Sequence, residues 1–225
     1  MIGGGPGAFI GPVHRIAAEL DREFRLVAGA FSSNAERSQQ AGRAYGIDPE
    51  RAYGDMEALI AGERARPDGA QLIAVVTPNH MHFPAAKAAL EAGFSVMSDK
   101  PATATLAEAL ALREIVARSS GHYGLTYTYT GYPMVREARE RIAAGEIGAL
   151  RKIVVEYFQG WLAGAPEQDG NKQAAWRVDP AQAGMGGCIG DIGVHAFHLA
   201  EFVAGSAVVA INPQLDWIVD GRSVD

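Results

Sequence analysis

The sequence predicts an α/β protein, in which a doubly wound, Rossmann-type parallel sheet is followed by a smaller, truncated α+β domain with an open, mainly antiparallel sheet. Three observations lead to this prediction. A glycine-rich loop occupies residues 3–8, short apolar runs then alternate with helical patterns as far as residue 126, and the run at 72–76 is continuously apolar. Alternation of this kind is typical of βαβ units, and a continuous apolar run is typical of a strand covered on both faces.

The first half contains a start or stop signal at most of the expected elements. We expect strands at 24–31, 72–76, 94–97 and 122–127, and helices at 12–20, 33–45, 82–92 and 105–119, with a short helix after Asp55. The patterns Ser33–Glu36 and Thr105–Glu108 are capping boxes, in which a hydroxyl and a carboxylate satisfy amides at a helix start. Gly93 is placed to end its helix in the left-handed conformation.

The pattern changes after residue 126, so we expect units at 1–126 and 127–225. We expect a helix at 133–144 ended by Gly145, a long strand at 150–161, a loop at 163–187, a helix at 191–203 and a last strand at 208–219. Only Met1 and Ile2 precede the glycine loop, where a buried strand of about five residues is usual. We therefore expect the chain to be a piece of a longer one.

Composition excludes some functional classes. The chain is 48% hydrophobic with a net charge of −6 and no basic run, which argues against a nucleic-acid partner. No apolar stretch approaches the roughly 18 residues of a membrane span, and no signal-peptide pattern is evident. The single cysteine, Cys188, fits a reducing, cytoplasmic location.

The loop Gly3-x-Gly5-x-x-Ala8 matches a dinucleotide-binding fingerprint. Small residues there let backbone amides and the start of the next helix, at Phe9 and Ile10, meet a pyrophosphate. The alternative is that these glycines form an ordinary turn.

The end of the second expected strand bears on which dinucleotide is bound. NAD-specific folds place a carboxylate there to bind the ribose hydroxyls. This chain has Ser32 and Ser33, with Arg37 shortly after, and these side chains suit a 2′-phosphate. We therefore favour NADP over NAD, with the alternative that Ser33 only caps a helix and Arg37 is merely solvated.

Two further strand ends carry candidate ligand-binding residues. Thr77, Pro78 and Asn79 follow a buried strand, at the edge where parallel sheets bind ligands. His80 and His82 invite a metal interpretation, but no third ligand is evident, so we expect no metal. His82 is expected near the cofactor or as a cap of the helix that it begins.

Asp99, Lys100 and Pro101 follow the next strand. The Lys100 ammonium is suited to donate to a substrate oxygen and stabilise negative charge there. Pro101 restricts the backbone, and Asp99 is expected to hold Lys100 or to face the ribose. The alternative is a surface turn.

Asp191 and His195 are spaced i,i+4, which places them on one face of a helix. A histidine accepts a proton near neutral pH, and an adjacent carboxylate orients it. His198, nearly one turn further on, is an alternative partner. A helix-capping aspartate beside a core histidine is the structural alternative.

Together these motifs resemble the Gfo/Idh/MocA family of oxidoreductases. The resemblance is carried by residues 3–8, 77–79 with His82, 99–101, 145–148 and 191–195. It implies a Rossmann domain, a C-terminal α+β domain that supports substrate binding and homo-oligomer contacts, and a catalytic group of Lys100, Asp191 and His195. The usual Glu-Lys-Pro is Asp-Lys-Pro here, and residues 127–130 lack the Asn and Arg that many members carry.

The resemblance implies hydride transfer between NAD or NADP and a sugar, inositol or related polyol. His195 would take the hydroxyl proton, Asp191 would orient His195, and Lys100 would donate to the same oxygen, although the roles of Lys100 and His195 are interchangeable. Candidates for substrate contact are Tyr129, Trp161, Trp176, Arg177 and Asp179, and the alternative for the last four is that they only pack or form salt bridges. The alternative is a dinucleotide-binding sensor of the same fold without turnover.

Overall fold

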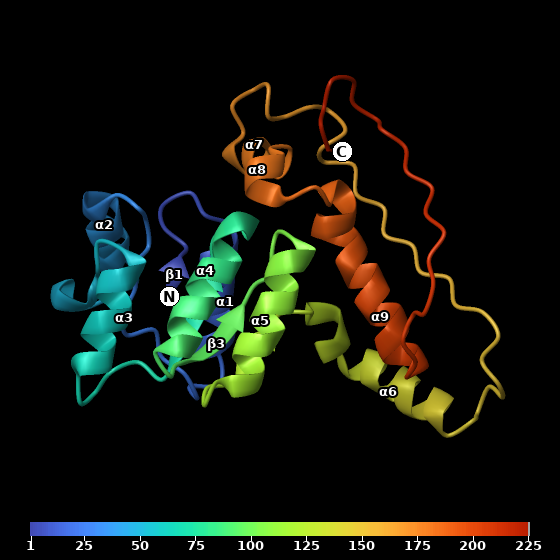
Figure 1. The fold of residues 1–225 in the computed structure, drawn as a ribbon, viewed down its shortest axis with the longest axis horizontal. Helices are drawn as coiled ribbons and strands as arrows, with labels where there is room; N and C mark the ends of the chain where they lie inside the picture. The colour runs from blue at the N-terminus through green and yellow to red at the C-terminus, as the bar shows by residue number, and fades with distance from the viewer. Residues whose placement is uncertain (225) are drawn as a thin grey trace. The chain divides into compact units, whose positions relative to one another are not determined.

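The computed structural model describes residues 1–224. The chain divides into two compact units, Met1–Thr126 (unit 1) and Tyr127–Asp225 (unit 2), which run from blue to green and from green to red in Figure 1. Among the described residues, no helix is long and apolar enough to cross a membrane.

Unit 1 contains a parallel sheet of four strands. In sheet order these are β1 (Ile2–Gly3), β2 (Leu72–Val76), β3 (Ser95–Ser98) and β4 (Tyr123–Leu125). Val75 lies opposite both Ile2 and Ser98, so the carboxyl ends of these three strands meet at one edge. The predicted parallel, Rossmann-type sheet is confirmed.

The strand predicted at 24–31 is largely wrong. Only Gly29 and Ala30 pair, through isolated parallel bridges to Ala52 and Ile2. The cause is local, because the Leu26 amide donates to Glu19 Oε1 instead of to a neighbouring strand. The end of the segment still lies beside β1, since the Gly3 amide donates to the Ala30 carbonyl over 2.9 Å.

The helices of unit 1 follow the predicted order. They are α1 (Ile10–Glu19), α2 (Ala35–Tyr45), α3 (Met56–Ala65), α4 (His82–Glu91) and α5 (Leu106–Arg118), with 3₁₀ turns η1 (Pro49–Arg51) and η2 (Asn79–Met81). The Thr105–Glu108 capping box and the Asp55 cap are present. The Ser33 cap is wrong, because Asn34 accepts from the Arg37 amide instead.

The core of unit 1 lies between the sheet and α3, α4 and α5. Leu59, Ile73, Val75 and Val96 are almost completely buried. Three alanines of α4 are also fully buried, and their small side chains let this helix pack closely on β2 and β3, as Figure 1 shows. This packing fixes the strand ends that carry the candidate site.

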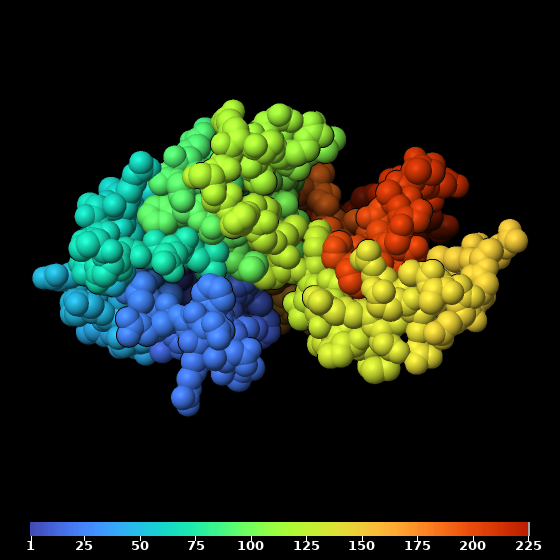
Figure 2. Space-filling model, turned by 90° about the horizontal axis from the view of Figure 1, so that it is seen from below, coloured from blue at the N-terminus to red at the C-terminus, as the bar shows by residue number. Residues whose placement is uncertain are grey.

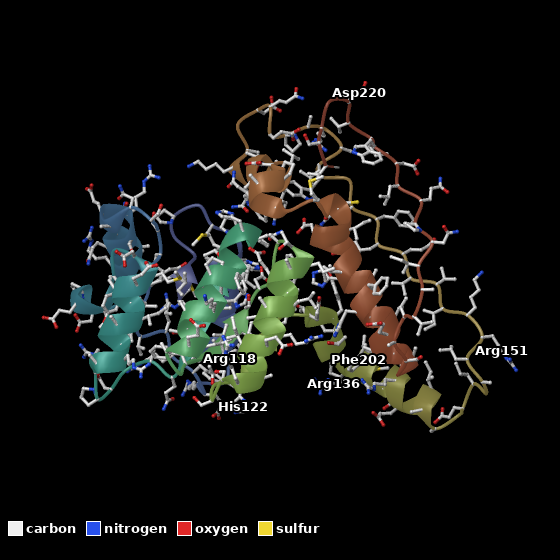
Figure 3. All side chains as sticks on the ribbon, in the orientation of Figure 1. Arg118, His122, Arg136, Arg151, Phe202 and Asp220 are labelled. Carbon is white, nitrogen blue, oxygen red and sulfur yellow. The ribbon has the colours of Figure 1, made fainter. Side chains whose placement is uncertain are left out.

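Unit 2 is helical. It contains η3 (Thr128–Gly131), α6 (Pro133–Ala143), α7 (Lys172–Arg177), α8 (Pro180–Ala183), a π-helical turn η4 (Ile189–Gly193) and α9 (Val194–Ala204). Helices α6 and α9 pack together, and the Arg139 guanidinium lies 4.4 Å from the centre of the Phe202 ring, which Figure 3 labels on α9.

The strands predicted at 150–161 and 208–219 are not formed, and no strand occurs among residues 127–224. The predicted loop at 163–187 also contains the short helices α7 and α8. Phe158 is 88% exposed and Val209 is 97% exposed, so no layer covers these segments. A strand needs a neighbouring strand and a covered face to be stable. The space-filling view shows the yellow segment after α6 at the surface of this unit (Figure 2).

Candidate functional site

The glycine loop is packed too tightly for larger residues. A Cβ added to Gly5 would lie 2.3 Å from the Phe31 carbonyl oxygen, and one added to Gly11 would lie 2.5 Å from the Gly4 Cα. The loop therefore lies directly against Phe31, at the end of the segment 24–31, and against α1. Gly4 is held further, because the Tyr45 hydroxyl donates to its carbonyl over 2.7 Å.

Helix α1 begins at this loop without a side-chain cap. Phe9 precedes the first turn of α1, makes no capping hydrogen bond through its side chain, and is exposed. An uncapped, exposed helix start is expected where a ligand binds to it. Unsatisfied amides at a helix N-terminus, with the helix dipole, favour an anion such as a pyrophosphate. This geometry is consistent with the predicted dinucleotide-binding loop at residues 3–8.

The serine and arginine side chains after Phe31 face solvent at the start of α2. Ser33 and Arg37 are exposed, and the Ser32 hydroxyl accepts from the Asn34 amide over 3.2 Å. Because Asn34 caps α2, the Ser33 hydroxyl is not used as the cap. The segment thus presents hydroxyls and a guanidinium, the groups that suit a ribose or its phosphate.

The end of β2 contains a buried hydroxyl that lacks a partner. Thr77 Oγ1 is buried and makes no hydrogen bond within the described residues, and Asn79 beside it is buried too. Buried polar atoms without partners are uncommon, and a ligand is one explanation. No group of three or more metal-ligating side chains occurs among the described residues, including around His80 and His82.

His82 does not cap α4, contrary to one of the two expectations. Its side chain is buried, with Nδ1 2.6 Å from the Pro101 carbonyl oxygen and Nε2 2.8 Å from the Thr77 carbonyl oxygen. Burial lowers the pKa of His82 below its ordinary value, although the two carbonyls oppose that shift. Both nitrogens are therefore occupied by backbone, and the ring links the ends of β2 and β3.

Asp99, at the end of β3, is tied to two other elements. The Thr126 hydroxyl donates to Asp99 Oδ1 over 2.8 Å, and His14 Nε2 on α1 lies 3.8 Å from the same oxygen. Burial opposes ionisation of Asp99, but the neighbouring His14 and Thr126 side chains outweigh it and lower the pKa of Asp99. Next to it, Lys100 is half-buried and precedes a cis peptide bond to Pro101.

In unit 2, an ion pair joins Asp191 of η4 to Arg177 of α7. The Arg177 Nε lies 3.1 Å from Asp191 Oδ2, and both side chains are mostly buried. The Arg177 guanidinium also lies 4.2 Å from the Trp176 ring centre and 5.5 Å from that of Trp161. Four predicted residues thus form one contact group.

His195 of α9 is surrounded by aromatic rings. The Tyr129 ring centre is 5.0 Å away and that of Tyr127 is 6.0 Å away, both edge to face. The Tyr129 and Tyr157 hydroxyls are 2.6 Å apart, and this hydrogen bond raises the pKa of Tyr129 to about 12. Asp191 lies in the π-helical turn, so the regular α-helical spacing expected between Asp191 and His195 is interrupted.

Both parts of the chain match models of known protein families. Residues 1–127 match the model of an oxidoreductase family with an NAD-binding Rossmann fold, and residues 135–225 match the Gfo/Idh/MocA C-terminal domain. The chain belongs to the Gfo/Idh/MocA oxidoreductase family. The resemblance expected from the sequence is confirmed.

Individual Gfo/Idh/MocA relatives agree with this assignment. The chain is 36% identical over 207 residues to the uncharacterized oxidoreductase YfiI of Bacillus subtilis, covering 90% of this chain and 52% of YfiI. It is 30% identical over 220 residues to levoglucosan dehydrogenase of Pseudarthrobacter phenanthrenivorans, covering 94% of this chain and 52% of that enzyme. The chain therefore spans about half the length of these relatives.

Among solved structures, the chain is similar to an inositol dehydrogenase homolog from Azotobacter vinelandii complexed with NAD⁺. The TM-score is 0.88 at 41% identity, over 91% of this chain and 52% of that one. A complex of levoglucosan dehydrogenase with NADH and levoglucosan gives a TM-score of 0.70 at 28% identity, over 91% and 53%.

The predicted residues of this Gfo/Idh/MocA chain fall into two sets. Unit 1 contains the expected cofactor residues and Lys100, which follow β1, β2, β3 and the segment 24–31. Unit 2 contains the expected substrate residues Tyr129, Trp161, Trp176, Arg177, Asp191 and His195. Sequence reasoning missed His14. A histidine on the helix that follows a glycine loop was the available signal, but only the fold places it beside Asp99.

Proposed function

We propose that the chain is the cofactor-binding and catalytic part of an NAD(P)-dependent dehydrogenase or reductase that acts on a hydroxyl of a sugar, inositol or related polyol. One observation carries the proposal. The ends of β1, β2 and β3 meet at one sheet edge, and they hold a tight glycine loop, a buried Thr77 hydroxyl without a partner, and Lys100. Parallel sheets bind ligands at this edge.

The cofactor would be held along that edge. Residues 3–8, with Phe9 and Ile10 at the start of α1, would meet the pyrophosphate, and Ser32, Ser33 and Arg37 the adenosine ribose. Thr77, Pro78 and Asn79 would lie toward the nicotinamide, with Lys100 at the reacting end. The bound nicotinamide supplies the hydride acceptor in oxidation and the hydride donor in reduction.

The protein's own groups would handle the proton. As the family resemblance implies, His195 would take the proton of the substrate hydroxyl, and the Lys100 ammonium would donate to the same oxygen and stabilise negative charge there, with these two roles interchangeable. Asp191 orients His195, and Arg177 fixes the position of Asp191 through their ion pair. Tyr129, Trp161 and Trp176 provide aromatic surface for the substrate ring, and Asp179 is a further candidate contact.

We propose NADP as the preferred cofactor, because the residues that follow Phe31 offer hydroxyls and the Arg37 guanidinium, with no carboxylate at Ser32 or Ser33. The relatives' names include both cofactors. The Azotobacter vinelandii homolog is complexed with NAD⁺, whereas a relative from Hypocrea jecorina, 32% identical over 138 residues (60% of this chain and 34% of that one), is a D-xylose 1-dehydrogenase (NADP⁺).

A fluorescence titration with NADPH and with NADH tests the proposed cofactor site. The wild-type chain should bind NADPH saturably and more tightly than NADH. Arg37→Ala should weaken NADPH binding about tenfold, the cost of one charge-assisted contact, and change NADH binding less than about twofold. Arg43→Ala, also exposed on α2, is the matched control and should change neither. Equal losses for both cofactors would refute the 2′-phosphate argument, and no saturable binding would refute the site.

We propose a cytoplasmic protein whose homo-oligomer contacts involve unit 2, where several large apolar side chains are exposed. Light scattering after size exclusion, on the wild type and on Val209→Ser, tests the second point. A mass that is monomeric for both would contradict it.

A further inference from the structure

The imidazole of His82 is a buried side chain with two short polar contacts that the proposed chemistry does not use. It is 1% exposed, at the start of α4 among fully buried alanines. Burying a titratable ring costs free energy unless its polar atoms are satisfied. An apolar side chain would fill this space equally well, so packing alone does not explain a histidine whose two ring nitrogens both contact backbone carbonyls.

The two carbonyls that the ring reaches lie on different strand-end loops. Pro101 directly follows Lys100 at the end of β3, and Thr77 directly follows β2. A carbonyl oxygen can only accept a hydrogen bond, so each of these contacts is favourable only when the ring nitrogen donates. A neutral imidazole donates through one nitrogen, and an imidazolium donates through both. An imidazolium therefore ties the Pro101 carbonyl to the β2 loop through both hydrogen bonds, and a neutral ring holds the Pro101 carbonyl in the tautomer that is protonated at Nδ1.

Lys100 is therefore fixed through both of its neighbours. On one side, Asp99 is held by His14 and the Thr126 hydroxyl, and its amide donates to the Val75 carbonyl over 2.9 Å. On the other side, the Pro101 carbonyl is held by His82. A residue whose flanking peptides are both anchored has the position of its Cα and the direction of its Cα–Cβ bond set before any ligand arrives.

We propose that His82 is a positioning residue for Lys100, clamping the peptide that follows it so that the ammonium points to the reacting oxygen. The inference rests on the proposed function for its catalytic consequence. The clamp itself is a property of unit 1 and is testable without turnover.

The first test measures how accessible Lys100 is to a small reagent. The chain is labelled with limiting acetic anhydride, and peptide mass spectrometry compares Lys100 with Lys87, an exposed lysine of α4. His82→Gln should raise the labelling of Lys100 relative to Lys87 at least about threefold, because the released peptide leaves the ammonium less constrained. His122→Gln is the control at an exposed histidine (Figure 3), and it should leave the ratio unchanged. An unchanged ratio in His82→Gln would overturn the proposal.

The second test is a double-mutant cycle on turnover. If His82 acts through Lys100, His82→Gln should lower kcat about tenfold in the wild-type background and less than about twofold in Lys100→Ala. NADPH binding should stay within about twofold in both. Equal losses in the two backgrounds would mean a general structural role and would refute positioning.

The two tests separate this inference from the proposed function. Absence of turnover in the wild type would contradict the proposed function, while the labelling ratio would still decide on the clamp. If His82→Gln does not fold, as judged by circular dichroism, NMR of the wild type decides. A slowly exchanging His82 ring N–H with an Overhauser contact to Pro101 or Thr77 supports the clamp, and a rapidly exchanging ring without these contacts overturns it.

Discussion

Unit 1 buries a core of apolar side chains between a sheet and helices, whereas unit 2 leaves many of its large apolar side chains on the surface. Leu59, Ile73 and Val75 have no exposed surface, but Phe158, Val209 and Ile218 are largely exposed. Both units carry apolar runs that are typical of strands. The difference teaches that such a run becomes a strand only where neighbouring strands and a covering layer are present.

The candidate residues are held differently in the two units. In unit 1, the residues flanking Lys100 are anchored by hydrogen bonds to backbone and to buried side chains. In unit 2, His195 packs against the Tyr129 ring, and Arg177 is held by its ion pair with Asp191, by the Trp176 ring and by hydrogen bonds to Gln173 within the same helix. We therefore expect substitutions in unit 1 to have larger effects on stability than similar substitutions in unit 2.

The largest expected difference concerns two glutamates in ion pairs. Glu63 is fully buried, pairs with Arg51, and also accepts from the Tyr53 hydroxyl and the Ala70 amide. Glu63→Gln should cost about 3 kcal/mol of unfolding free energy, because it leaves the buried guanidinium without its main counter-charge. Urea unfolding followed by far-ultraviolet circular dichroism measures this loss.

Glu146→Gln is the matched substitution in unit 2. Glu146 pairs with Arg141 over 3.2 Å, and both side chains are more than half exposed, so the loss should stay below about 1 kcal/mol. The three tryptophans, Trp161, Trp176 and Trp217, all lie in unit 2, so their fluorescence reports that unit alone. Equal losses for the two glutamates would contradict the comparison.

Lys100→Ala should lower kcat at least about 10²-fold, equivalent to about 2.7 kcal/mol, while NADPH binding stays nearly unchanged. The reason is that its ammonium is proposed to act on the reacting oxygen and not on the remote parts of the cofactor. Lys87→Ala, at an exposed site on α4, is the control and should have no effect. Unchanged turnover in Lys100→Ala would remove this residue from the mechanism.

Much of unit 1 could be predicted from its sequence, because its signals are local. The capping box at Thr105, the Asp55 cap and the continuous strand β2 all depend on neighbouring residues. The strand predicted at 24–31 was wrong because the Leu26 amide donates its hydrogen bond to Glu19, seven residues earlier, instead of to a neighbouring strand. The contact between His14 and Asp99 joins residues far apart in the chain, and no local pattern encodes such a contact.

Unit 2 was harder to predict for a physical reason. The alternation at 150–161 and the apolar run at 208–219 are genuine strand signals, yet strand formation is decided by partners that a local pattern does not contain. Helices α6 and α9 were predicted well, since helical hydrogen bonds form within the segment. The π-helical turn at Asp191 was missed because its spacing differs little from that of an α-helix.

One glycine substitution in each unit sharpens the comparison. Gly5→Ala should destabilise unit 1 by about 1–3 kcal/mol and weaken NADPH binding, because the added Cβ would lie 2.3 Å from the Phe31 carbonyl oxygen. Gly131→Ala meets nothing within 4 Å, so stability should change by less than about 0.5 kcal/mol. Thermal unfolding and the NADPH titration measure both. Normal NADPH binding by Gly5→Ala would show that the loop is not tightly packed.

The smallest expected effects come from pH, and they have opposite signs in the two units. The pKa of Asp99 is lowered in the folded chain, so its hydrogen bond from Thr126 and its contact with His14 stabilise unit 1 above the ordinary aspartate pKa of about 4, and this contribution is lost as pH falls through the lowered value. The pKa of Tyr129 is raised to about 12 by Tyr157, so that contribution is complete below about pH 10 and is lost as pH rises through 12.

Two hydroxyl deletions separate these effects. Thr126→Val should raise the pKa of Asp99 and thereby move acid unfolding of unit 1 to higher pH, as followed by circular dichroism, with no change at alkaline pH. Tyr157→Phe should return Tyr129 toward a pKa of about 10, visible as earlier tyrosinate absorbance at 295 nm, with no change at acid pH. Because the Tyr129–Tyr157 pair is partly exposed, solvent weakens its contribution to stability, so the alkaline effect should be the smaller of the two. A larger alkaline effect would mean that the aromatic group around His195 is packed more tightly than its exposure indicates.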